Sequence, residues 1–235
     1  MVVTILSCED KGALNRACSE IGKGRIIVYP TDTVFGLGTN PRSSEGVSRC
    51  FSIKTRDNSK RLPVLYSSLK ELAEVAIIDK RARSLASHFW PGKLTMILPL
   101  THDADYPELL TGKDRTIAAR IPGHKCALNL IRSCGGSLIG TSANISGNRS
   151  IVDPEDEELA RIASKCDYFL KGKCGDSNLS STIVDLATNS SEIRILREGA
   201  VKTETILAYF EKQSRLDFSS KKSTMRESGN VSGTK

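Results

Sequence analysis

Aromatic residues, histidines and long apolar runs are scarce in this chain. Aromatic residues make up 5% of the 235 residues, and we find no base-stacking pair on a strand of the kind that RRM domains use to bind RNA. The three histidines, His88, His102 and His124, do not form metal-ligand spacings with the cysteines. No apolar run approaches the ~18 residues of a membrane span. These absences argue against an RRM-like RNA binder, a zinc site and a membrane protein.

Nucleotide-binding loops of the two common kinds are also missing. The chain contains neither G-x-x-x-x-G-K-[ST] nor G-x-G-x-x-G. The net charge of +7 nevertheless favours polyanionic partners, such as nucleotide phosphates or RNA. Any nucleotide phosphates must therefore be bound mainly by side chains.

The seven cysteines include no C-x-x-C pair, and several lie on apolar helix faces. This pattern predicts reduced core thiols in a cytosolic compartment. The segment Met1–Leu6 is too short for the apolar part of a signal peptide and is followed by acidic residues. We therefore expect a cytoplasmic protein, with a mitochondrial or plastid form left open.

A hydrophobic content of 39% over this length is enough for one sizeable core, so the sequence predicts a single domain over 1–213. From 214 to 235 the chain is rich in Ser, Lys, Gly and Thr and has few large apolar residues. We expect this segment to be a disordered tail, and we expect Leu216–Lys235 to be deletable without loss of fold or activity.

Strands and helices are mixed along the sequence rather than strictly alternating, which predicts an α/β fold with one twisted mixed β-sheet flanked by helices. The strands are expected at Arg25–Tyr29, Pro63–Tyr66, Leu94–Leu100, Thr116–Ile121, Ser137–Gly140, Tyr168–Leu170, Ser181–Leu186 and Ile193–Arg197. The helices are expected after a capping box at Ser7–Asp10, at Ser43–Ile53, at Leu69–His88 with a break near Ile77–Asp79, and at Lys125–Ser133, Asp153–Ala163 and Thr203–Lys212.

Two polar segments could hold an anion. Lys54 and Arg56 are two residues apart at a predicted helix end, and arginine offers a planar fork that matches phosphate oxygens. Ser142 and Asn144 follow a strand in a turn, where hydroxyl, amide and backbone N–H groups can surround an anion. Taken alone, each segment also has an ordinary structural explanation, a solvated surface pair for the first and a glycine-flanked turn for the second.

Seven segments taken together resemble the YrdC family, in the same order as in that family. They are Tyr29–Gly38, Lys54–Arg56, Phe89–Thr95, Thr116–Pro122, Gly140–Gly147, Ser181–Asp185 and Leu196–Ala200. The resemblance implies a single YrdC-like domain with a concave basic substrate cleft. It also implies an L-threonylcarbamoyladenylate synthase, a nucleotidyltransferase that joins L-threonine, bicarbonate and ATP in the first step of making threonylcarbamoyl-adenosine in tRNA.

The same resemblance implies roles for individual residues. Lys54, Arg56, Ser142 and Asn144 are expected to be catalytic and to bind the nucleotide. Thr33, Arg120, Gly140 and Ser181 are expected to bind threonine. Lys60, Thr116, Ser150 and Arg197 are expected to complete the nucleotide side. Mg²⁺ is expected to arrive with ATP rather than at a metal site of the protein. A tRNA threonylcarbamoyltransferase complex is the expected downstream partner, and direct tRNA contact stays open.

The sequence departs from the family pattern at two places near these residues. Many relatives carry Asn/Lys-Pro-Leu and then a histidine that approaches threonine, whereas this chain reads Lys60-Arg61-Leu62-Pro63-Val64-Leu65. Leu65 stands about where that histidine would be, and Phe35 replaces the usual tyrosine. Two main alternatives stay open, namely a non-catalytic RNA-binding translation factor and a carbamoyl-adenylate-forming enzyme. A third alternative is a regulatory relative with a decayed site.

Overall fold

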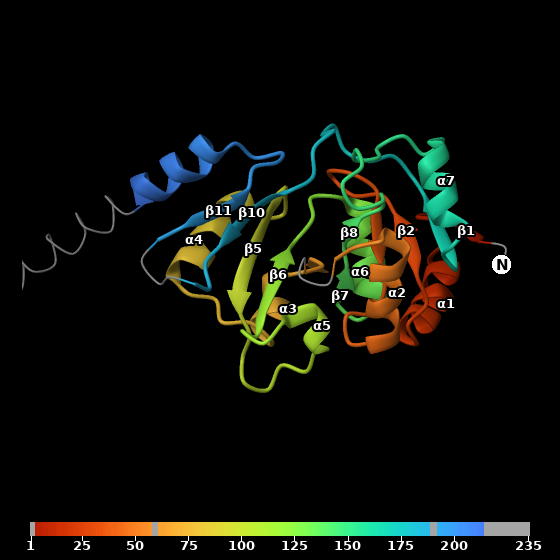
Figure 1. Cartoon of the computed structure of the whole chain (residues 1–235), viewed down its shortest axis with the longest axis horizontal. Coiled ribbons are helices and arrows are strands. Elements are labelled where there is room, and N and C mark those ends of the chain that lie inside the picture. The colour runs from red at the N-terminus through yellow and green to blue at the C-terminus, as the bar shows by residue number, and fades with distance from the viewer. Residues whose placement is uncertain (1–2, 58–60, 189–191, 214–235) are drawn as a thin grey trace, which may run out of the picture.

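The computed structural model describes residues 3–57, 61–188 and 192–213 (Figure 1). These residues form two mixed sheets rather than the single sheet that the sequence predicted. The five-stranded sheet has the order β1 (Thr4–Ser7), β9 (Tyr168–Lys171), β2 (Ile27–Tyr29), β3 (Gly36–Gly38) and β8 (Thr141–Ser142). The six-stranded sheet has the order β11 (Arg194–Arg197), β10 (Thr182–Asp185), β5 (Leu94–Pro99), β6 (Thr116–Arg120), β4 (Val64–Tyr66) and β7 (Ser137–Ile139). The α/β fold is confirmed.

Strand β2 shows why its sheet is buried on both sides. Because successive side chains of a strand point to opposite faces, a continuous β-branched run fills two cores at once. Val28 packs in the larger core, which lies between the two sheets and their helices, while Ile27 and Tyr29 pack in a second core against α1 and α6. All three residues are fully buried.

The helices agree closely with the sequence pattern. They are α1 (Lys11–Gly22), α2 (Ser44–Lys54), α3 (Leu69–Ala73), α4 (Lys80–Phe89), α5 (Glu108–Thr111), α6 (Lys125–Ser133), α7 (Glu157–Ala163) and a last helix over 203–213. Ser43, Asp79 and His124 each accept a hydrogen bond from a backbone N–H in the first turn of α2, α4 and α6, and thereby fix where these helices begin.

Two helix starts were predicted wrongly. Asp10, not Ser7, caps α1, with its carboxylate 2.8 Å from the Ala13 nitrogen. The predicted start of α7 at Asp153 is four residues too early, because Asp156 supplies the N-cap and Asp153 instead accepts a hydrogen bond from the Glu155 nitrogen within a turn. Strand β1 was missed, since its pairing with β9 depends on residues far along the chain.

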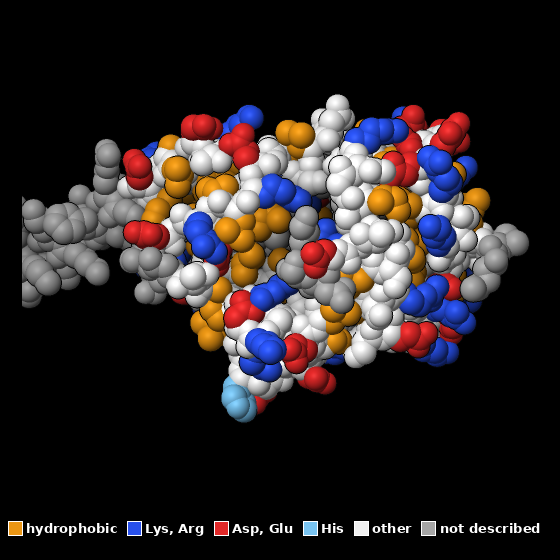
Figure 2. All heavy atoms as spheres, viewed as in Figure 1, with side chains coloured by type: hydrophobic (Ala, Val, Ile, Leu, Met, Phe, Trp, Pro, Cys, Tyr) orange, Lys and Arg blue, Asp and Glu red, His pale blue; other side chains and the backbone are white. Residues whose placement is uncertain are grey.

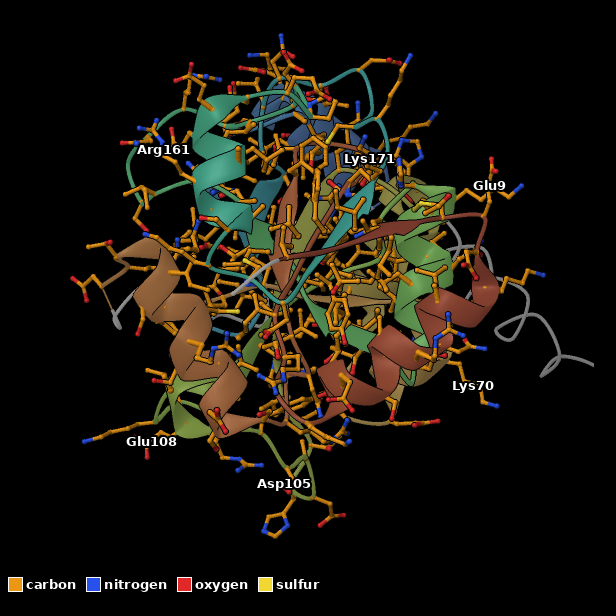
Figure 3. The ribbon with its side chains drawn as sticks, turned by 90° about the vertical axis from the view of Figure 1, so that its right-hand side faces the viewer. Glu9, Lys70, Asp105, Glu108, Arg161 and Lys171 are labelled. Atoms are coloured by element: carbon orange, nitrogen blue, oxygen red, sulfur yellow. A yellow bond between two sulfur atoms is a disulfide. The ribbon has the colours of Figure 1, made fainter. Side chains whose placement is uncertain are left out.

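The prediction that all cysteines are reduced is also wrong for this structure. Two disulfides are formed (Figure 3). Cys8–Cys126 joins the segment before α1 to the start of α6, and Cys18–Cys134 joins α1 to the C-cap of α6. Their Cα–Cα distances of 5.6 and 4.8 Å lie in the normal range for disulfides. The partners are more than a hundred residues apart, so their proximity arises from the side-by-side packing of the two helices and not from any local spacing.

Within the described ranges, no helix is both long and apolar enough to cross a membrane. The predicted tail at 214–235 lies outside the described residues, so its expected disorder stays a prediction.

Candidate active site

A cavity of about 690 Å³ lies between the two sheets and is open to solvent. This volume is typical of small-molecule sites. The five-stranded sheet contributes β3, β8 and the loop before β3, while the six-stranded sheet contributes β5, β6, β10 and β11. Lysine and arginine side chains gather with apolar ones on the face of the molecule between the sheets (Figure 2). The arginines that line the cavity are Arg56, Arg61, Arg120, Arg194 and Arg197.

Arg120 forms a rigid, buried cation at one end of this cavity. Its Nε donates a hydrogen bond to the Gly92 carbonyl at 2.8 Å, and Nη1 donates to Thr33 Oγ1 at 3.1 Å. Nη2 donates to Asp32 Oδ1 in an ion pair whose two side chains are less than a tenth exposed. Burial lowers the pKa of Arg120, and the charge of Asp32 opposes this shift. The guanidinium is therefore held in one orientation before any ligand arrives.

Four threonine and serine hydroxyls form two hydrogen-bonded pairs, and one of these pairs contacts Arg120 through Thr33. Thr33 Oγ1 also lies 3.0 Å from Thr31 Oγ1, and the Thr31 hydroxyl donates to the Val34 carbonyl at 2.7 Å. On the opposite sheet, Ser181 Oγ lies 2.8 Å from the fully buried Thr95 Oγ1. The fixed positions of these hydroxyls suit recognition of a small ligand that carries both an anionic group and a hydroxyl.

The two departures from the family pattern lie in the same cavity. Leu65 and Phe35 both line it. A Cβ atom at Gly140 would come within 2.3 Å of Leu65 Cγ, so the leucine side chain lies directly against the Gly140 backbone. The wall at this point is therefore apolar, and Gly140 is required because Leu65 occupies the space a larger residue would need.

Arg56 and Arg197 also line the cavity. Arg56 Nη2 donates to the Arg61 carbonyl at 2.9 Å, and Arg197 Nη2 donates to the Ser181 carbonyl at 2.6 Å. Burial lowers the pKa of Arg197 first, and the charges of Arg56 and Arg120 lower it further. The three guanidinium groups therefore share one volume, which attracts a ligand with several negative charges.

Lys54 supports the Ser142–Asn144 turn from behind and does not line the cavity. The side chain is 1% exposed, and its Nζ donates to the Ser142 carbonyl, to the Asn144 carbonyl at 2.6 Å and to Asn144 Oδ1 at 3.2 Å. Burial lowers the pKa of Lys54 to about 7, and the charge of Arg56 acts in the same direction. The sequence predicted a direct phosphate contact, whereas in this structure Lys54 contacts the turn.

The turn itself presents Ser142 to the cavity and turns Asn144 inward. Ser142 Oγ donates to Asn144 Oδ1 at 2.6 Å, and Asn144 Nδ2 donates to the Asn148 carbonyl at 2.7 Å. Asn144 is 6% exposed and, like Lys54, is not part of the cavity wall. Both polar ends of its amide therefore stabilise the turn.

The remaining predicted residues divide into three groups. Thr116 lines the cavity, whereas Ser150 lies behind it, with its hydroxyl 3.2 Å from that of the cavity residue Ser180. Lys60 lies outside the described residues. The site residues assigned from the sequence leave out eight polar residues of the wall, namely Thr31, Arg61, Asp114, Thr141, Ser180, Asp185, Thr188 and Arg194. Arg61 carried a signal, since it stands where relatives have proline.

Three comparisons place these observations among known proteins. The Sua5/YciO/YrdC family model, described as telomere recombination, matches residues 19–199. A threonylcarbamoyl-AMP synthase of Pyrococcus abyssi is 31% identical to this chain. The match covers 88% of this chain and 59% of the length of that relative. A threonylcarbamoyl-AMP synthase of Pseudoalteromonas translucida is 32% identical over 75% of this chain and 94% of its own length.

One solved structure resembles this chain both in fold and in sequence. The crystal structure of P. abyssi Sua5 complexed with L-threonine superposes with a TM-score of 0.79 at 30% identity, over 89% of this chain and 61% of that one. This chain thus spans about three fifths of the P. abyssi synthase sequence and of the P. abyssi Sua5 chain. On the match to the family model and on these relatives, the chain belongs to the Sua5/YciO/YrdC family.

Proposed function

We propose that the protein is an L-threonylcarbamoyladenylate synthase, which forms threonylcarbamoyl-AMP and pyrophosphate from L-threonine, bicarbonate and ATP. The observation that carries this proposal is the juxtaposition, in one cavity, of the fixed Arg120 and its hydroxyl neighbours with the group of arginines around Arg56. The first part suits an amino acid with a hydroxyl, and the second suits a triphosphate.

Threonine binds in this proposal at the Arg120 end. In this proposal its carboxylate pairs with the guanidinium and its hydroxyl contacts Thr33 and Ser181, which both line the cavity. The relative from P. abyssi with L-threonine in its structure supports this choice of amino acid. The methyl group of threonine suits the apolar wall of Leu65.

ATP binds in this proposal with its phosphates facing Arg56, Ser142 and Arg197, and Thr116 also lines the cavity. Among the described residues, no cluster of three His, Cys, Asp or Glu side chains could hold a metal ion. Two carboxylates of the cavity wall, Asp114 and Asp185, are each paired with an arginine. Mg²⁺ therefore fits this site as an ion carried by the ATP phosphates, where it would neutralise part of their charge.

The reaction follows from this placement. The threonine amine adds to CO₂ derived from bicarbonate and loses a proton, which gives a carbamate. A carbamate oxygen then attacks the α-phosphorus of ATP, and the bond to the β-phosphate oxygen breaks to release pyrophosphate. Arg56 and the neighbouring donors neutralise charge on the phosphoryl oxygens, and the cavity aligns the two reactants. No covalent intermediate on the protein is needed.

The product supplies the threonylcarbamoyl group for modification of tRNA next to the anticodon, so a tRNA threonylcarbamoyltransferase complex is the proposed partner.

We infer a cytoplasmic or organellar location with this partner. Disulfides persist in oxidising compartments and are rare in the cytosol, so the two disulfides argue against a reducing location. Alkylation of the thiols at cell lysis, followed by mass spectrometry, would measure their oxidation state.

The decisive experiment is incubation of the protein with ATP, Mg²⁺, bicarbonate and L-threonine, followed by mass spectrometry of the nucleotides. We expect threonylcarbamoyl-AMP and pyrophosphate in equal amounts, and neither product when threonine is omitted. ATP cleavage that does not depend on threonine, or a product formed from carbamoyl phosphate, would instead support a carbamoyl-adenylate-forming enzyme. RNA binding with no ATP consumption would support the translation-factor alternative.

A further inference from the structure

We propose that Arg61 is a nucleotide-phosphate ligand that Asp114 holds in place before ATP binds, and that ATP binding exchanges the Asp114 carboxylate for phosphate oxygens. This inference rests on the proposed function, because ATP is the ligand involved. It concerns a residue that differs from the family pattern, in which proline occupies this position.

Arg61 is built into the cavity wall beside Thr116. Its Nη1 donates a hydrogen bond to Thr116 Oγ1, and its Nη2 donates to Asp114 Oδ1. A Cβ atom at Gly112 would lie 2.4 Å from Arg61 Nη2, so the glycine at the end of α5, with φ of +69°, leaves room for the guanidinium. These contacts keep the guanidinium against the cavity wall in the absence of a ligand.

Arg61 is also linked to the other phosphate-binding candidate. Its carbonyl oxygen accepts the hydrogen bond from Arg56 Nη2, so the backbone of one arginine positions the guanidinium of the other. The two residues thus line one stretch of the cavity. A phosphate chain that reaches Arg56 would also lie near Arg61.

The phosphate oxygens of a polyanion can replace the Asp114 carboxylate as the partner of Arg61. The Asp114 side chain is 60% exposed, and an ion pair with an exposed carboxylate contributes little to stability. A triphosphate offers more negative charge and several oxygens to the same planar fork. The Arg120–Asp32 pair differs in this respect, since its side chains are only 6% and 8% exposed and are not easily separated.

The test measures ATP binding by isothermal titration calorimetry without threonine or bicarbonate. Arg61→Gln should weaken ATP binding by about tenfold or more, because a charge-assisted contact is lost, and should leave adenosine binding unchanged. Asp114→Asn should tighten ATP binding by about two- to threefold, because the competing carboxylate is gone. Asp103→Asn is the matched control, since this side chain is 99% exposed, is not part of the cavity wall and carries the same charge.

The double variant Arg61→Gln/Asp114→Asn decides whether the two residues act through each other. If the exchange occurs, Asp114→Asn has no effect on ATP binding once Arg61 is gone. Unchanged ATP affinity in Arg61→Gln would overturn the assignment and leave the proposed function intact. Weaker ATP binding in Asp114→Asn would overturn the exchange, because Asp114 would then be a support for Arg61. No ATP binding by the unaltered protein would overturn the proposed function itself, together with this assignment.

Discussion

Replacement of Lys54 by methionine separates a supporting role from a ligand-binding one. Methionine keeps the length of the side chain but donates no hydrogen bonds, so the Ser142 and Asn144 carbonyls lose the donor that Lys54 supplies. Asn144 Oδ1 still accepts from the Ser142 hydroxyl. Each of the two buried acceptors left without a donor costs ~1–3 kcal/mol, so we expect the free energy of unfolding to fall by about 2–6 kcal/mol.

The pH dependence gives this prediction a second readout. Burial lowers the pKa of folded Lys54 to about 7, whereas an unfolded lysine titrates near ~10.4. Between these values the unfolded chain binds more protons than the folded chain, so the contribution of Lys54 to stability increases as the pH rises above 7, by at most ~1.4 kcal/mol per pH unit. The difference in stability between the unaltered protein and Lys54→Met should therefore widen from pH 7 to 9.

Urea denaturation at several pH values measures both effects. Lys11→Met is the control, because Lys11 is exposed at the start of α1 and far from the turn in sequence. If Lys54→Met loses turnover but unfolds with the same free energy as the unaltered protein, the supporting role is refuted. Lys54 would then act on the ligand itself, as the sequence alone predicted.

Three further outcomes are expected. Arg120→Lys keeps the charge but loses the planar fork, so the threonine concentration needed for half-maximal rate should rise by about tenfold or more while ATP affinity changes less than twofold; equal losses for both substrates would contradict the placement of threonine. Ser181→Ala should reduce the preference for threonine over valine in competition assays, because a polar partner of the hydroxyl is removed, and an unchanged preference would exclude that contact. Under non-reducing conditions Cys18→Ser should lower the free energy of unfolding by about 3 kcal/mol, because with Cys8–Cys126 intact the Cys18–Cys134 bond closes a ring of only about 20 residues, whereas after reduction it should resemble the unaltered protein. The buried free thiol Cys50 offers a matched Cys50→Ser control, and equal stabilities with and without reductant would show that the Cys18 disulfide is not formed.

Local patterns predicted the secondary structure well because most elements here are defined by nearby residues. Helix α6 was predicted over the same residues that it occupies, and the break between α3 and α4 was expected near Ile77–Asp79. Capping side chains and apolar periodicity determine such limits within a few residues. The division into two sheets could not be predicted in this way, because it depends on which distant strands pair.

The candidate site was predicted in part. The resemblance indicated the positions of Arg120 and Arg56, and both line the cavity. It could not show that Lys54 lies beneath the turn, because a lysine at a helix end has the same local sequence whether it faces a ligand or a carbonyl group. Asp114 was missed for a similar reason, since a polar loop between two strands gives no signal until the fold brings it to the wall.

The order of strands has a consequence for synthesis of the protein. In the five-stranded sheet, β9 lies between β1 and β2, although it follows them by well over a hundred residues. In the six-stranded sheet, β10 joins β5 at a similarly late stage. Neither sheet can be completed while the ribosome is still making the first two thirds of the chain, and such non-local pairing slows folding. The nascent chain must therefore keep unpaired strand edges from aggregating until the last strands emerge, which favours expression at low temperature or with chaperones.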